Sequence, residues 1–144
     1  MNITKHLSYY EATHSETAVK YGINNQPTEV QLILIERLAS AVFEPLREWA
    51  GHPIKINSLF RCEELNSHKD VKGASTSQHL CINGAAMDIK SLGKKTNAEL
   101  FHYIKDNLDF DQLIWEYGTT KNPQWVHVSY NNGHNRRQVL YTKK

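Results

Sequence analysis

One long helical pattern comes first in the sequence, and all the strand candidates follow it. Six apolar residues between positions 28 and 51 recur at helical spacing: Leu34, Ile35, Leu38, Val42, Leu46 and Trp49. Thr28 and Gln31 form a capping box at the start of this helix, and Gly51 is suited to its end. Pro45 removes a backbone hydrogen bond inside the pattern, so we expect a kink or a break near residues 43–44.

A second capping box, formed by Thr96 and Glu99, predicts a shorter helix that reaches about residue 107 and packs on a sheet. Five short segments have strand character, several of them with period-two alternation: residues 53–57, 86–90, 112–117, 124–130 and 136–141. Turn signals at 118–123 and 131–133 separate the last three strands, which we expect to form an antiparallel meander. The predicted fold class is α+β, with a mostly antiparallel sheet and flanking helices.

The length of 144 residues predicts one domain over residues 1–144, since two cores would each bury too little apolar surface. A net charge of +2 is too small to indicate a nucleic-acid partner. No stretch approaches the roughly 20 apolar residues of a membrane span, and the first residues lack the pattern of a signal peptide. We expect a monomer without a membrane partner. Cys62 and Cys81 could form at most one bridge, and we expect two free thiols.

Three polar side chains near the predicted strands have the chemistry of a metal site. His79 lies on a loop, and small residues connect it to Asp88 on the next strand. Strand alternation places Asp88 opposite the apolar Met87 and Ile89, and it places His127 opposite its valine neighbours. Two imidazoles and one carboxylate with an open fourth position form a catalytic zinc shell, whereas structural zinc sites are closed. Each histidine could instead be a hydrogen-bonded core residue.

Several motifs together resemble the M15 family of zinc D-Ala-D-Ala carboxypeptidases and murein endopeptidases, especially its small phage-type members. They are Asn57-Ser58-Leu59-Phe60-Arg61-Cys62, Glu64-Leu65-Asn66, Ser77-Gln78-His79, Gly84-Ala85-Ala86-Met87-Asp88, Asp111-Gln112-Leu113-Ile114-Trp115-Glu116 and Trp125-Val126-His127-Val128-Ser129. The resemblance implies the fold shared by these peptidases and hedgehog signalling domains, with a Zn²⁺ cofactor held by His79, Asp88 and His127. It also implies that Arg61 meets a substrate carbonyl or carboxylate, and that Ser77 is a hydrogen-bonding neighbour of the substrate. A structural salt bridge is the alternative role for Arg61.

The sequence departs from the family pattern in two places. Four residues, instead of the usual two, separate His79 from Gly84, so the loop must bulge before Asp88 reaches the metal. Many members carry an acid three positions before the second histidine, where this chain has Gln124. A glutamine cannot take a proton from water, so another residue must act as the base.

Glu116 is the best replacement for that acid. If the hairpin is centred between Thr120 and Lys121, Ile114 faces His127 and Glu116 faces Trp125, which places Glu116 on the side of the ligands. A register shifted by one residue would send Glu116 to the opposite face, where it would be an exposed strand glutamate.

The resulting hypothesis is zinc-dependent hydrolysis of peptide bonds in bacterial peptidoglycan, with the peptidoglycan peptide as the partner. Trimming of D-Ala-D-Ala termini and opening of cross-links both remain open. Two alternatives are a cell-wall-peptide-binding module that has lost its base, and a structural phage component. The absence of a visible export signal suits a phage-type lysin that a holin releases, or an enzyme that stays in the cytoplasm.

Overall fold

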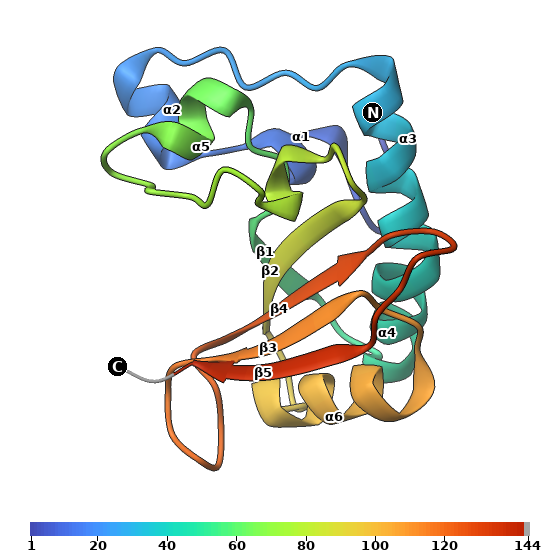
Figure 1. The fold of residues 1–144 in the computed structure, drawn as a ribbon. Helices are drawn as coiled ribbons and strands as arrows, with labels where there is room; N and C mark the ends of the chain where they lie inside the picture. Colours follow the sequence, from blue (N-terminus) through green and yellow to red (C-terminus); the bar gives the residue numbers. More distant parts are fainter. Residues whose placement is uncertain (143–144) are drawn as a thin grey trace.

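A five-stranded sheet forms one layer of the molecule, and its neighbours in order are β1, β2, β4, β3 and β5 (Figure 1). The computed structural model describes residues 1–142. The strands are β1 (Ile54–Ser58), β2 (Ala85–Ser91), β3 (Gln112–Glu116), β4 (Trp125–Tyr130) and β5 (Gln138–Thr142). All neighbouring pairs are antiparallel except β3 and β5, which are parallel. The mostly antiparallel sheet with flanking helices confirms the predicted α+β class.

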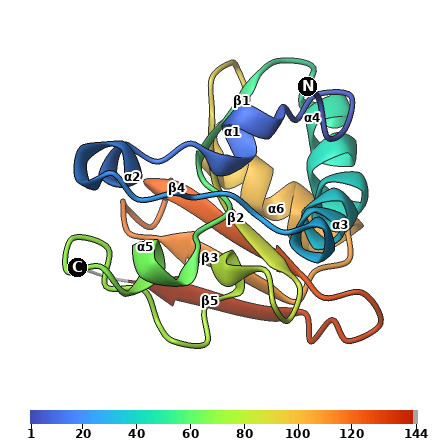
Figure 2. The ribbon, with the colours of Figure 1, turned by 90° about the horizontal axis from the view of Figure 1, so that it is seen from above.

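The helices on one side of this sheet enclose the main core with it (Figures 1 and 2). They are α3 (Glu29–Leu38), the π-helical segment η1 (Ala39–Phe43), α4 (Glu44–Ala50) and α6 (Asn97–Asn107). The sheet contributes the buried side chains of alternate positions, such as Met87 and Ile89 on β2 and Val126 and Val128 on β4. Polar side chains at the positions between them therefore face the other side of the sheet.

The long helical segment begins and ends as the sequence predicts. The Thr28 hydroxyl accepts from the N–H of Gln31, and the Gln31 side chain accepts from the N–H of Thr28. Gly51 ends α4 with a left-handed φ of 72°, which a glycine adopts without steric cost. Pro45 does not break the segment, because the chain widens into η1 directly before it, where the N–H of Glu44 bonds the carbonyl of Ala39.

The shorter helix α6 follows its capping box, in which Thr96 and Glu99 satisfy each other's backbone N–H groups. It buries Leu100, Phe101 and Ile104 and packs against the sheet, as predicted. None of the helices described in residues 1–142 is long and apolar enough to cross a membrane.

The predicted three-strand meander is wrong in its last strand. β5 does not return beside β4; it runs parallel to β3 on the far side of it, with Gln112 opposite Gln138 and Glu116 opposite Thr142. β4 has no free edge, because β2 occupies one side from Tyr130 to Val126 and β3 occupies the other. The segment after the turn at Asn131 must therefore cross to the open edge of β3.

Short helices near the N-terminus and after β1 support the segment that carries Arg61. They are α1 (Tyr9–Thr13), α2 (Glu16–Tyr21) and α5 (Glu63–Ser67). The side chain of Asn25 donates to the carbonyls of Thr13 and Phe60 and accepts from the N–H of Cys62. This buried amide fixes the backbone on both sides of Arg61. Cys62 and Cys81 are both free thiols.

Candidate metal centre

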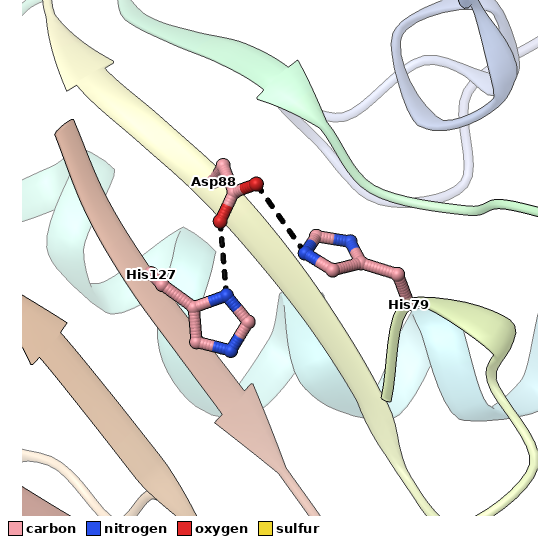
Figure 3. Close-up of side chains that lie close together, drawn as sticks. All are labelled: His79, Asp88 and His127. Carbon is pink, nitrogen blue, oxygen red and sulfur yellow. Dashed lines mark hydrogen bonds and ion pairs between the residues drawn. The ribbon is translucent and has the colours of Figure 1, made fainter. Parts of the chain in front are cut away.

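Asp88 and His127 are direct neighbours across the two strands β2 and β4. Both side chains point away from the core, because Met87, Ile89, Val126 and Val128 occupy the alternate positions. The Nδ1 of His127 lies 2.9 Å from Oδ1 of Asp88 (Figure 3). The sheet thus supplies two of the three predicted ligands from one antiparallel pair.

His79 reaches the same place from η2 (Gln78–Leu80), a short 3₁₀ turn outside the sheet. Its Nδ1 lies 2.7 Å from the carbonyl oxygen of Leu59, and its Nε2 lies 3.3 Å from Oδ2 of Asp88. The carbonyl can only accept a hydrogen bond, so Nδ1 carries a proton, and Nε2 is the ring nitrogen that faces Asp88 and could bind a metal ion. A backbone carbonyl behind a histidine in this way is the usual second partner of a metal-ligating imidazole.

The three side chains converge on one point, as Figure 3 shows. One ligand atom from each of His79, Asp88 and His127 lies within 4.8 Å of the other two. Two imidazoles and one carboxylate match the donor set of a catalytic zinc site, and the open cavity leaves room for a fourth ligand. The residues present therefore fit a zinc ion.

Asp88 is held in its charged form. Burial alone would raise the pKa of its carboxyl, but the charges and hydrogen bonds of His79 and His127 outweigh burial and lower that pKa well below its usual range. An ionised carboxylate is the form that binds a metal ion.

An open cavity of about 770 Å³ lies over the cluster. Its walls come from the outer face of the sheet and from the segments that follow α5 and β4. The cavity brings together all the site residues that the sequence predicts: Arg61, Ser77, His79, Asp88, Glu116 and His127. A cavity of this size can accommodate a peptide of a few residues.

Arg61 and Ser77 contact each other beside His79. Nη2 of Arg61 donates to the Ser77 hydroxyl at 3.3 Å, and that oxygen also accepts from the N–H of His79 at 3.2 Å. Burial lowers the pKa of Arg61 while the charge of Asp88 opposes this effect, and the guanidinium stays cationic. Among the described residues Arg61 makes no ion pair with a carboxylate, so the alternative role in a structural salt bridge is not observed.

Glu116 lies on the face that carries His127. The register is the one predicted, with Ile114 opposite His127 and Glu116 opposite Trp125. One carboxylate oxygen accepts from the hydroxyl of Thr142 on β5 at 2.8 Å. Gln124, in contrast, is exposed and does not line the cavity.

The longer loop after His79 bulges as expected. Cys81 adopts a left-handed conformation with a φ of 55°, and the Gln78 amide donates to the carbonyl of Asn83 at 2.9 Å. Gly84 has a φ of 87°, and a Cβ there would lie 2.3 Å from the carbonyl oxygen of Tyr130. The extra residues are thus taken up before β2 begins, so Asp88 keeps its place.

The sequence reasoning missed the far wall of the cavity, where Asp111, His134 and Arg136 lie. Asp111 is 2% exposed and forms an ion pair with Arg136. Its position in a family motif was the available signal, but the partner that neutralises it follows β4 by a turn and could not be inferred from spacing.

Comparisons with known proteins agree with this geometry. The sequence model of the peptidase M15 family matches residues 5–129, which include the three predicted ligands, Arg61 and Glu116. No curated protein matches the chain. Because the match covers most of the sequence and the cluster has the donor set of a zinc centre, the chain belongs to the M15 peptidase family.

Proposed function

We propose that this chain is a zinc-dependent peptidase that hydrolyses peptide bonds in bacterial peptidoglycan. The observation that supports the proposal most directly is the His79, Asp88 and His127 cluster at the floor of an open cavity that also holds a carboxylate and a guanidinium. Family membership supports the peptidase class and the metal.

The metal supplies one part of the chemistry: bound zinc is a Lewis acid that polarises a carbonyl and lowers the pKa of water toward neutrality. His79 and His127 would hold it through neutral imidazole nitrogens, and Asp88 would add one negative charge. The carbonyl of Leu59 keeps the proton of His79 on Nδ1, so that Nε2 remains available.

Glu116 is the proposed general base. It accepts a proton from the attacking water and later delivers that proton to the leaving amine, a cycle for which one carboxylate suffices. Its place on the face of His127 and within the cavity supports this role. The hydrogen bond from Thr142 orients one of its oxygens, and the other accepts no hydrogen bond from the described residues.

Arg61 and Ser77 are the proposed substrate contacts. The guanidinium donates to the scissile carbonyl, where negative charge develops, or to a substrate carboxylate, and its planar fork suits both. Ser77 orients the guanidinium through Nη2 and presents its hydroxyl to the cavity. A partly buried cation exerts a stronger field on such a group than one in water.

Mass spectrometry of products from a defined set of muropeptides, with and without a chelator, tests the proposal. We expect cleavage that stops on chelation and returns with zinc, and the products identify the bond and distinguish terminal trimming from opening of cross-links. Cleavage that is unaffected by chelation would exclude the zinc mechanism. Zinc binding without any release of amines would instead support a cell-wall-peptide-binding module.

A further inference from the structure

The proposed metal site is built from two structural units. Asp88 and His127 lie on paired strands, so the sheet fixes the distance between them. His79 lies on η2, outside the five-stranded sheet. The ring and the backbone carbonyl of His79 bond to Leu59 and Arg61, in the segment that follows β1, a strand that carries neither of the other two ligands. A metal ion tolerates little variation in ligand distance, so a connection from this turn to the strand of His127 would help to hold the three ligands at the right spacing.

Asp111 supplies such a connection. Its backbone N–H donates to the carbonyl of Ser129 on β4 at 2.8 Å, which fixes the residue against the strand that carries His127. Its buried carboxylate accepts from the side-chain amide of Gln78, the residue before His79, at 2.7 Å. One side chain therefore links the strand of one ligand to the turn of another.

Hydrogen bonds from Arg136 offset the cost of burying the Asp111 carboxylate. Arg136 donates to it from its backbone N–H at 2.9 Å, from Nε at 2.8 Å and from Nη2 at 3.1 Å. Burial would raise the pKa of Asp111, but the bonds from Arg136 and Gln78 lower it overall. A buried, charged acceptor of this kind makes strong hydrogen bonds, so the Gln78 contact is a firm one.

The amide of Gln78 has only one workable orientation. Both hydrogens on Nε2 are used, one by the carbonyl of Asn83 and one by Asp111. A flipped amide would place an oxygen against two acceptors. The Oε1 that remains has no partner among the described residues.

We propose that Asp111 is a positioning residue that acts through Gln78: it holds the turn of His79 at the distance from Asp88 and His127 that one metal ion requires. The inference rests on the proposed zinc site. It also explains why Gln78 and Asp111, which belong to separate motifs of the sequence, contact each other in the structure.

Zinc affinity, measured by competition with a fluorescent chelator, tests this inference without any substrate. Gln78→Met keeps the volume of the side chain and removes the donor, and we expect the Kd for zinc to rise about 10- to 100-fold, as for other residues that orient a metal ligand. Asp111→Leu, which removes both oxygens that could accept from Gln78, should weaken binding in the same direction. In the double variant the two losses should not add, because both changes remove the same contact.

Arg136→Met is the matched control. It removes the other partner of Asp111 but leaves the contact with Gln78, so we expect lower stability in urea with a zinc Kd within about threefold of the wild type. If Gln78→Met binds zinc as tightly as the wild type, or if Arg136→Met loses as much affinity as Gln78→Met, the proposed role of Asp111 is wrong. If the wild type itself binds no zinc, the proposed function and this inference both fail.

Discussion

Glu116 and Gln124 are joined at the backbone but serve different faces of the molecule. The N–H of Gln124 donates to the carbonyl of Glu116 at 2.9 Å, next to the pair formed by Glu116 and Trp125. The side chain of Glu116 nevertheless lines the cavity, whereas that of Gln124 is exposed. Strand alternation, not nearness in the sequence, decides which of the two can meet a substrate.

Replacement of Glu116 by glutamine should lower kcat by about 10²- to 10⁴-fold, because the variant loses a general base. The zinc content of the variant should stay near that of the wild type, since Glu116 is not one of the clustered ligands. Hydrolysis rates on a muropeptide, together with metal analysis of the same sample, measure both quantities.

Gln124→Glu is the matched control for that experiment. It restores the acid that many family members carry at this position, but outside the cavity of this chain. We expect it to change kcat by less than about threefold in the wild type, and not to rescue Glu116→Gln, since proton transfer needs hydrogen-bond contact. Near-normal turnover by Glu116→Gln, or rescue by the second change, would assign the base elsewhere.

Some residues of the candidate metal centre could be predicted from the sequence and others could not. His79, Asp88 and His127 could be named because each stands in a motif and two of them follow strand parity. Asp111 could not be assigned a role, because its importance depends on burial and on partners from two distant segments. Burial of a charged side chain is a property of the folded chain that a local pattern does not contain.

The β3–β4 hairpin and β5 differ in how much local sequence determines them. The register of the hairpin follows from its short connection and its alternating residues, and it was predicted correctly. The place of β5 depends on β2, a strand far away in the sequence that occupies the edge of β4. A non-local pairing decides the topology there, so the turn signal at residues 131–133 could not reveal it.

Gly84, the residue directly before β2, is expected to be essential to the pairing of β2 with β4. Gly84→Ala should lower the free energy of unfolding by about 2–5 kcal/mol, because the left-handed φ of 87° is strained for alanine and the Cβ would meet the carbonyl of Tyr130 at 2.3 Å. Gly51→Ala is the control: its φ of 72° is also left-handed, but a Cβ there meets nothing within 4 Å. We expect only about 1–2 kcal/mol for Gly51→Ala in urea titrations, and equal losses would show that the close approach at Gly84 is relaxed at little cost.

For the molecule as a whole, metal binding should appear as thermal stability. A ligand that binds only the folded chain, at a concentration of about 1,000 times its Kd, adds about 4 kcal/mol to the free energy of unfolding. We therefore expect zinc to raise the Tm and a chelator to lower it again, measured by calorimetry at a fixed protein concentration. His127→Ala, which removes one of the three clustered groups, should show no such response. An unchanged Tm for the wild type would mean that zinc has no preference for the folded chain.

Stability toward acid depends in part on Glu44, which ties the N-terminal residues to α4. Burial would raise the pKa of this carboxyl, but hydrogen bonds from Thr4 and His6 lower it overall. Because the pKa is lower in the folded than in the unfolded chain, the stabilisation is present above about pH 4.5 and is lost as the pH falls below that value.

The free energy of unfolding of Glu44→Gln should therefore be about 1–2 kcal/mol below that of the wild type at pH 7. At pH 3.5 the difference between the two proteins should be smaller. Urea titrations at the two pH values measure the difference. Glu36→Gln, a change at an exposed position of α3, is the control: its free energy of unfolding should stay near that of the wild type at both pH values. If the stability difference between Glu44→Gln and the wild type grows in acid, Glu44 does not have the lowered pKa described above.

The division of the ligands between sheet and turn also determines how a metal ion could leave. Backbone amides of the central strands exchange with solvent mainly when the whole chain unfolds, whereas a short turn opens at lower free energy. Within residues 1–142 the partner of the N–H of His79 is the hydroxyl of Ser77 and not a backbone carbonyl, so this amide should exchange deuterium sooner than the amides of β2 and β4. Zinc would then dissociate by local opening of η2 while the sheet stays intact, and its release rate should follow deuterium uptake at His79 rather than at Asp88 or His127.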